Sequence, residues 1–229
     1  MNNLQGRKLS PGHPLTLPDA LSSAAAFTAL DSWSGLVREI YGYETHRFEA
    51  IQANEVTGIL ALTHVRHPLF GNYLATSPFG SFGGFAFSSN GARDLLLKEA
   101  KLLADDLGVD YATVRFEEPE ESPAAGWVPH PVYSTYRVDL LPDPEKMLGA
   151  FSSDHRNHIR KSLKKGFAMK FGHMDLLHDA YECLARSMHE LGSPYHAKTY
   201  LRRMADMLGD ALEFVAMYDE HRELAGAGV

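Results

Sequence analysis

The sequence predicts an α/β (α+β) protein in which mixed sheets flanked by helices form two domains, the second of them incomplete. Helical and strand-like periodicities alternate along the chain, which is typical of sheets covered by helices. The run LPDP at 141–144 interrupts this pattern and indicates a boundary. A similar order of helix, glycine and hairpin occurs on each side of it. We therefore expect an irregular segment at 1–30, a first domain at 31–141 and a partial second domain at 142–229.

The first domain is expected to open with a short helix and a group of strands. Ser32 is a suitable cap for a helix over 33–41, which ends at Gly42. Asn54 and Glu55 lie between two alternating runs and predict a hairpin turn. The three strands expected here are at 46–53, 56–65 and 72–77.

A longer helix is expected next, beginning after Ser89 and ending at Gly108, because apolar residues recur there at helical spacing. A strand follows at 111–116. Residues 117–126 are acidic and contain proline, which predicts a solvated loop. Alternation returns at 133–140 and predicts the last strand of the domain.

The second domain is expected to begin with helices. The four helices predicted in it are at 144–150, 154–165, 176–191 and 197–208. The three strands predicted in it are at 167–171, 212–218 and 224–229, of which the last two form a hairpin.

Glycines at matching places suggest that the two domains are copies of one another. A helix ends at Gly42 and a hairpin strand contains Gly58, while Gly209 and Gly226 hold the same places in the second half. Such a match can also arise by chance. If the duplication is real, the second copy lacks about 80 residues that the first has after its hairpin. We therefore expect a fragment that is inactive by itself.

The composition excludes several classes of protein. A chain of 229 residues with 45% hydrophobic residues can bury one or two cores. A net charge of −7 argues against a general nucleic-acid coat, and no DNA partner is expected. Cys183 is the single cysteine, so no disulfide forms within the chain; we expect a small core residue rather than a reactive thiol. No run is long and apolar enough to span a membrane, and a cytoplasmic protein is expected.

The segment 154–166 (DHRNHIRKSLKKG) carries the strongest charge pattern. Between 154 and 170 there are six basic residues and one acidic residue, and few acids lie four positions away to neutralise them. One interpretation is a helix that binds an anionic ligand, since arginine suits phosphate or carboxylate. The other is a solvated basic face, or one paired with the acids of 117–121. The bases expected to contact the ligand are Arg156, Arg160, Lys161 and Lys164.

Two further segments are candidate parts of a binding site. The run 69–85 (LFGNYLATSPFGSFGGF) combines aromatic residues with glycines, so Phe79, Gly83 and Gly84 either line a substrate pocket or serve turns and core packing. Tyr195 and His196 lie in a turn between two helices, where they either face a cleft or lie on the surface.

No metal site is expected, because no cysteine or carboxylate set accompanies His155 and His158 to complete one. The motif GxSxG, which marks the nucleophile of many hydrolases, does not occur. The catalytic residues are not assigned.

Several motifs in order resemble the FemAB-like proteins, which consist of two GNAT-type acyltransferase domains in tandem. They cover about residues 30 to 229, and each motif alone is only moderately specific. The matching residues are Leu69-Phe70-Gly71, Pro78-Phe79, Phe82-Gly83-Gly84, Leu107-Gly108-Val109-Asp110-Tyr111, Arg156-Asn157, Ile159-Arg160-Lys161, Lys165-Gly166, Leu191-Gly192-Ser193-Pro194 and Lys198. The branch associated with exosortase and exopolysaccharide loci is the most similar.

The resemblance implies an N-acyltransferase. Cell-wall members of the family transfer an amino acid from aminoacyl-tRNA to an amine of a peptidoglycan precursor. The resemblance therefore implies no bound cofactor, an acyl donor that is either aminoacyl-tRNA or acyl-CoA, and an anionic small-molecule or lipid-linked acceptor. The resemblance also implies tRNA as a candidate partner. It implies that the basic helix binds phosphates and takes no part in the chemical step. The alternative is a non-catalytic module that binds a polyanion through the same helix.

Overall fold

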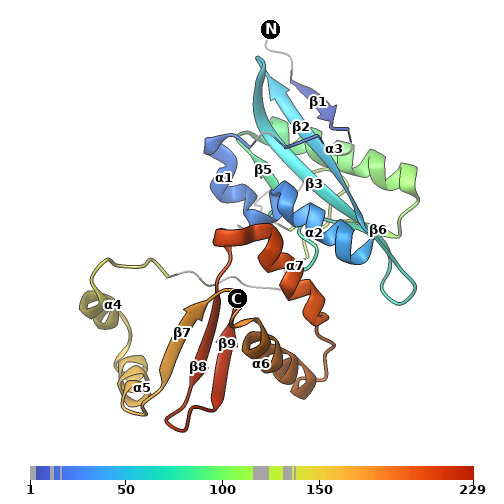
Figure 1. Ribbon diagram of the computed structural model, residues 1–229. Helices are drawn as coiled ribbons and strands as arrows, with labels where there is room; N and C mark the ends of the chain where they lie inside the picture. The colour runs from blue at the N-terminus through green and yellow to red at the C-terminus, as the bar shows by residue number, and fades with distance from the viewer. Residues whose placement is uncertain (1–3, 11–12, 16, 116–123, 131–135, 137) are drawn as a thin grey trace. The chain divides into compact units, whose positions relative to one another are not determined.

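The computed structural model describes residues 4–10, 13–15, 17–115, 124–130, 136 and 138–229 (Figure 1). The chain divides into two compact units, 1–135 and 136–229. The boundary predicted from the sequence lies a few residues later, after residue 141. Each unit is a layered arrangement of sheet and helices, and each is described by itself below.

Unit 1 is built on a six-stranded sheet. Its strands are β1 (Gln5–Lys8), β2 (Glu44–Gln52), β3 (Glu55–His67), β4 (Gly71–Ala75), β5 (Phe85–Phe87) and β6 (Tyr111–Thr113). The order is β1-β2-β3-β4-β6, and β5 pairs with β3. All neighbours are antiparallel except β4 and β6, which are parallel. The sheet is therefore mixed, as the sequence predicts.

Helices cover both faces of this sheet (Figure 1). They are α1 (Asp19–Ala25), the 3₁₀ helix η1 (Phe27–Ala29), α2 (Asp31–Tyr41) and α3 (Asn90–Leu107). On one face, α3 packs its buried Ala92, Leu96 and Ala100 against the sheet. On the other, α1 packs against Ile59 of β3. The two clusters of apolar side chains give unit 1 a core on each side of its sheet.

The structure confirms most elements expected in the first domain and shifts some ends. Ser89 caps α3 by accepting a hydrogen bond from the Ala92 amide at 3.3 Å, and Gly108 ends the helix in the left-handed conformation. Gly42 ends α2 in the same way, but α2 begins at Asp31, so Ser32 lies inside the helix and is not its cap. The hairpin turn is Ala53-Asn54, with φ of 51° and 65°, one residue earlier than expected.

The prediction of an irregular segment at 1–30 is wrong, because β1, α1 and η1 all lie there. All four residues of β1 are exposed, so the strand carries no hydrophobic alternation and is held by its pairing with β2. β5 was also missed, since it has three residues and follows two glycines. Of the strand expected at 133–140, Tyr136 and residues 138–140 lie outside any strand, and Leu140 is 85% exposed; the other positions lie outside the described residues.

Unit 2 has a three-stranded antiparallel sheet in the order β7-β8-β9. The strands are β7 (Ala168–Gly172), β8 (Phe214–Tyr218) and β9 (Leu224–Gly228). The helices are α4 (Pro144–Ala150), α5 (Ser153–Leu163), α6 (Leu177–Glu190), α7 (Lys198–Leu208) and the 3₁₀ helix η2 (Gly209–Ala211). Phe214 and Ala216 of β8 are fully buried, as is Ala180 of α6, while α4 and α5 have no buried residue. Cys183 on α6 is half-buried.

Strand pairing confirms that the units share one pattern. The order β1-α1-α2-β2-β3 in unit 1 recurs as β7-α6-α7-β8-β9 in unit 2, with the same antiparallel neighbours. Gly58 of β3 pairs with Ala50, and the residue before it, Thr57, has no partner in β2. Gly226 of β9 pairs with Met217, and the residue before it again has no partner in β8. Each hairpin thus carries a β-bulge directly before its glycine, which supports the duplication independently of sequence.

Candidate functional site

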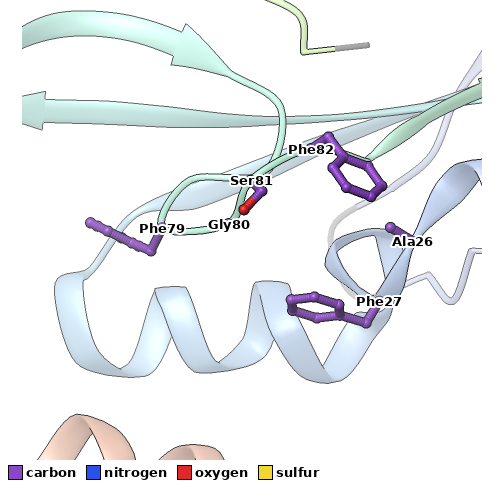
Figure 2. A pocket seen from close by; sticks show the side chains of 6 residues that line it. All are labelled: Ala26, Phe27, Phe79, Gly80, Ser81 and Phe82. Atoms are coloured by element: carbon purple, nitrogen blue, oxygen red, sulfur yellow. The ribbon is translucent and has the colours of Figure 1, made fainter. Parts of the chain in front are cut away.

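A pocket lies beside the loop between β4 and β5 in unit 1. Its volume is about 470 Å³, and it is lined by Ala26, Phe27, Phe79, Gly80, Ser81 and Phe82. Figure 2 shows Phe27 and Phe82 near Ala26, with Phe79 at the other end of the loop and directed away from them. Three of the six residues are phenylalanines, so the pocket is suited to an apolar or planar group.

Buried hydroxyl groups hold this loop in place. The Thr28 and Ser77 hydroxyl oxygens are 2.7 Å apart, and the Thr28 hydroxyl also donates to the Phe82 carbonyl at 3.0 Å. Ser77 and Phe79 have positive φ angles of 51° and 63°, which non-glycine residues rarely adopt. The hydrogen bonds that offset this strain connect the loop to η1, so the pocket wall is fixed by contacts far apart in sequence.

Arg115 fixes the loop from the other side. Its backbone amide donates to the Thr76 hydroxyl at 2.9 Å, and its Nη1 donates to the Gly80 carbonyl at 2.7 Å. Because Thr76 is fully buried, this pair of bonds ties the residues after β6 to the start of the loop. A guanidinium group therefore lies next to the pocket in addition to its aromatic lining.

Gly83 and Gly84 lie behind the pocket and not in its lining. Both are buried and have positive φ angles, of 107° and 72°. A Cβ atom on Gly83 would be 2.4 Å from the Thr28 hydroxyl oxygen and 2.6 Å from the Ala25 carbonyl. The Gly84 amide donates to that same carbonyl at 2.9 Å. The two glycines therefore allow the loop to approach the junction between α1 and η1 closely.

Aromatic rings continue from Phe79 along the surface of unit 1. The ring centroids of Tyr41 and Phe79 are 4.5 Å apart, and Tyr41 stacks on Tyr43 at 5.8 Å. On β4 and β6, Tyr73 and Tyr111 stack at 5.0 Å with an interplanar angle of 4°. Burial, followed by the neighbouring Tyr111, raises the pKa of Tyr73, so its phenol remains neutral at physiological pH.

The basic helix α5 forms a second candidate site, in unit 2. The expected contact Arg156 is half-buried, and its Nη1 donates to the carbonyls of Phe151 and, at 3.4 Å, Gly149. It therefore joins the start of α5 to the end of α4 and has fewer donors left for a ligand. Sequence spacing grouped Arg156 with the other bases but could not show that its side chain bonds to nearby backbone carbonyls.

The remaining bases of α5 face solvent. Arg160, Lys161, Lys164 and Lys165 are exposed, and no described acid forms an ion pair with them. On this helix the His158 Nε2 lies 3.5 Å from a carboxylate oxygen of Asp154. The acids of 117–121, which were the alternative partners, lie outside the described residues. Four adjacent cations without described counter-charges form a surface that attracts anions.

Tyr195 and His196 pack within an aromatic group of unit 2. Tyr195 is 6.1 Å from Tyr181, and His196 stacks on Tyr200 at 4.3 Å, measured between ring centroids. Burial lowers the pKa of His196, so its ring is neutral at pH 7. Burial, followed by Tyr181, raises the pKa of Tyr195. Both residues are half-buried, and a neutral imidazole can accept a proton but adds no positive charge to an anion site.

The structure thus groups the predicted residues by element. Phe79, Gly83 and Gly84 share one loop in unit 1, while the bases share α5 and the Tyr195–His196 turn joins α6 to α7 in unit 2. Sequence reasoning missed Ala26 and Phe27, since no periodic signal marks them. Within the described ranges, no three His, Cys, Asp or Glu side chains lie close enough to hold a metal ion together. No helix in this part of the chain is long and apolar enough to cross a membrane.

The architecture, in which two α/β units follow one another along the chain, is a FemX-like fold. It is similar to the crystal structure of FemX, with a TM-score of 0.55 at 14% identity over 90% of this chain. The match covers 57% of FemX, so the chain spans little more than half the length of that protein.

A tandem GNAT protein from the clavulanic acid biosynthesis pathway, solved without AcCoA, matches with a TM-score of 0.42 at 14% identity, over 98% of this chain and 73% of that one. No protein-family model matches the sequence, and no curated protein sequence matches it significantly.

Proposed function

We propose that the chain is part of an N-acyltransferase of the Fem type, which transfers an acyl or aminoacyl group to an amine of an anionic acceptor. Support for the reaction class comes from the FemX-like tandem fold together with the sequence motifs. The observation that carries the anionic acceptor is α5, whose exposed Arg160, Lys161 and Lys164 have no described acid partner. The proposed acceptor belongs to the cell envelope or to an exopolysaccharide pathway and is a small molecule or lipid-linked.

In the proposed reaction a neutral amine attacks the carbonyl carbon of the activated acyl group. The new C–N bond forms, the bond to the ester oxygen of aminoacyl-tRNA or the thioester sulfur of acyl-CoA breaks, and the amine proton leaves to a base. Positioning of both substrates and stabilisation of the oxyanion contribute most of the rate. The bases of α5 in unit 2 would hold phosphates of the acceptor. The aromatic pocket beside Phe79 in unit 1 is a separate candidate site for an apolar group. No residue is assigned to the chemical step.

A second candidate function is a non-catalytic module that binds a polyanion. It rests on the same helix, because α5 has no buried residue and its exposed Arg160, Lys161 and Lys164 could contact an extended anionic chain. Such binding would weaken steeply as salt rises. The two proposals share the anion site and differ in whether acyl transfer occurs.

The anion site is tested by calorimetry with UDP-N-acetylglucosamine and inorganic pyrophosphate as probes. We expect the double variant Arg160→Ala/Lys164→Ala to weaken binding about tenfold or more, since each charge-assisted hydrogen bond contributes about 1.5–3 kcal/mol. The matched control is Lys98→Ala/Lys101→Ala, which removes two exposed charges from α3 and should leave affinity unchanged. If both double variants weakened probe binding equally, the loss would be due to net charge alone, and a site on α5 would be refuted.

The reaction is tested with the full-length gene product, given acyl-CoA or aminoacyl-tRNA and an amine acceptor. Transfer from either donor supports the acyltransferase and identifies the donor. Binding of the probes without transfer from either donor favours the polyanion-binding module. Absence of both binding and transfer would overturn both proposals.

A further inference from the structure

The hairpin between β3 and β4 carries two large apolar side chains at its tip. Leu69 is 84% exposed and Phe70 is 64% exposed. The turn that holds them, 67–71 (HPLFG), contains no aspartate, glutamate, lysine or arginine. Figure 1 shows this loop extending beyond the neighbouring strands of unit 1. Single exposed apolar residues are ordinary on protein surfaces, but two together on a projecting turn indicate a contact with another surface.

Strand pairing shows why the tip projects. β2 pairs with β3 as far as His64, and among the described strands the last residues of β3, 65–67, pair with β4 alone. On its other side β4 pairs with β6 only from Tyr73 onward. The end of the hairpin is therefore a two-stranded arm that lies past the strands on either side of it.

Hydrogen bonds fix this arm against the segment between α3 and β6. The Asn72 amide donates to a carboxylate oxygen of Asp110 at 3.1 Å, and the Asp110 amide donates to the Asn72 carbonyl at 2.7 Å. Within the turn, the Leu69 amide donates to His67 Nδ1 at 3.1 Å. The His67 ring also stacks on Phe70, with centroids 4.6 Å apart. Because the turn is already ordered, its two apolar side chains lose little conformational entropy when they are covered.

Amphipathic side chains lie directly behind the tip. Tyr73 of β4 stacks on Tyr111 of β6 with ring centroids 5.0 Å apart, and Tyr111 is 52% exposed. Arg66, next to the turn, is exposed and forms no ion pair with the described residues. At a lipid–water interface, apolar side chains enter the acyl region, tyrosine rings lie at the level of the headgroups, and arginine reaches the phosphates. The hairpin presents these three kinds of side chain in that order.

We propose that the tip formed by Leu69 and Phe70 inserts into the surface of a zwitterionic phospholipid bilayer, with Arg66 at the level of the headgroup phosphates. Shape and size favour a bilayer over a protein partner. Two side chains on a convex turn cannot bury the roughly 800 Å² per partner that a stable protein interface needs. A bilayer surface, in contrast, accepts a few apolar side chains and binds them weakly and reversibly.

The charges at this end of unit 1 favour neutral lipid over anionic lipid. Asp105 and Asp106 are exposed at the end of α3, and Asp110 follows directly. Their carboxylates would repel an anionic surface, so the binding comes from burial of apolar area and should hardly change with salt. The proposal rests on unit 1 and depends neither on acyl transfer nor on the anion site of α5.

Insertion is tested with the intact chain carrying Phe70→Trp and an excess of phosphatidylcholine vesicles. We expect the tryptophan emission to shift to the blue and to be quenched by phosphatidylcholine brominated on its acyl chains, because the ring leaves water for the acyl region. The matched control is Leu102→Trp, which places the same probe at an exposed apolar position of α3 and should show neither change. Trp33 and Trp127 are present in both variants, so the wild type gives their background.

The contribution of the tip is measured by vesicle flotation over a range of lipid concentrations. Leu69→Ser/Phe70→Ser should lower the partition coefficient at least tenfold, since burying either side chain fully contributes about tenfold or more. Both side chains are exposed, so the fold should be preserved, and circular dichroism checks this. The matched control is Leu102→Ser/Val128→Ser, which removes two exposed apolar side chains elsewhere in unit 1 and should partition as the wild type does.

Three results would overturn the proposal. The first is no quenching of Phe70→Trp at high lipid concentration, or an equal loss of partitioning in both double variants. The second is binding that requires phosphatidylglycerol and disappears in high salt, because the cations of α5 would then be the membrane contact. The third is self-association of the chain that Leu69→Ser/Phe70→Ser abolishes in analytical ultracentrifugation, because a second copy would then cover the tip.

Discussion

Gly83 decides how closely the β4–β5 loop approaches the start of unit 1. Its φ of 107° is unfavourable for any residue with a side chain, and the nearest atoms to a Cβ there belong to Thr28 and the Ala25 backbone. The pocket is formed by residues on both sides of this contact, Ala26 and Phe27 on one and Phe82 on the other. A side chain at Gly83 would also come within 2.7 Å of the Cβ of Ala26, which lines the pocket, so a change at Gly83 acts on the shape of the pocket.

We expect Gly83→Ala to lower the free energy of unfolding of unit 1 by about 2–4 kcal/mol, since backbone strain adds to overlap with fixed backbone atoms. Gly108→Ala is the matched control: its φ is 58°, but no atom lies within 4 Å of the added Cβ, so it should cost only about 1 kcal/mol. Urea denaturation followed by circular dichroism measures both. Equal losses would mean that the φ angle alone matters and that the contact with Thr28 and Ala25 does not constrain the loop.

Features that depend on one segment of the sequence were easier to predict than contacts between segments far apart in the sequence. The aromatic and glycine composition of 69–85 suggested a pocket, and Phe79 does line one in the structure; its role in binding a substrate stays a prediction. The same sequence could not show that Phe27 forms the other side, because that contact joins segments without any shared pattern. Nor could spacing show that Arg156 donates to the Phe151 carbonyl, since helical periodicity gives the flank of a side chain and not its partner.

At the scale of elements, periodicity predicted what repeats over several turns. The long helices α3, α6 and α7 were found within a few residues of their ends, because burial of one stripe imposes a regular pattern. β1 escaped prediction because its side chains are all exposed and its place is fixed by hydrogen bonds to β2. The sequence did not predict the β-bulges of the two hairpins either, although the glycines next to them suggested the duplication.

The repeated glycines should respond differently to the same change. Gly58→Ala brings a methyl group against Ala92 and Leu96 of α3, so we expect unit 1 to lose about 1–3 kcal/mol of stability. Gly226→Ala meets only the flexible end of Met217, and its effect should stay within about 0.5 kcal/mol. Thermal and urea denaturation of both variants measures the difference. A comparable loss at Gly226 would indicate that its face is already tightly packed.

At the scale of the molecule, the units differ in how much apolar surface their sheets bury. In unit 1 the central strand β3 directs Leu60 and Leu62 into the cluster under α3 and Ile59 into the cluster with α1, and all three are fully buried. In unit 2 the central strand β8 has Phe214 and Ala216 fully buried on one face only. Since burial of apolar area is the main source of stability, unit 2 should open at a lower free energy.

Hydrogen exchange tests this difference on two strands that are both paired on each side. We expect the amides of β8 to exchange at least tenfold faster than those of β3, which corresponds to about 1.4 kcal/mol less opening free energy. Mass spectrometry of peptides from 214–218 and 55–67 gives the two rates. Equal rates in the free chain would mean that both strands open in one cooperative step, and that the single covered face of β8 is as protective as the two of β3.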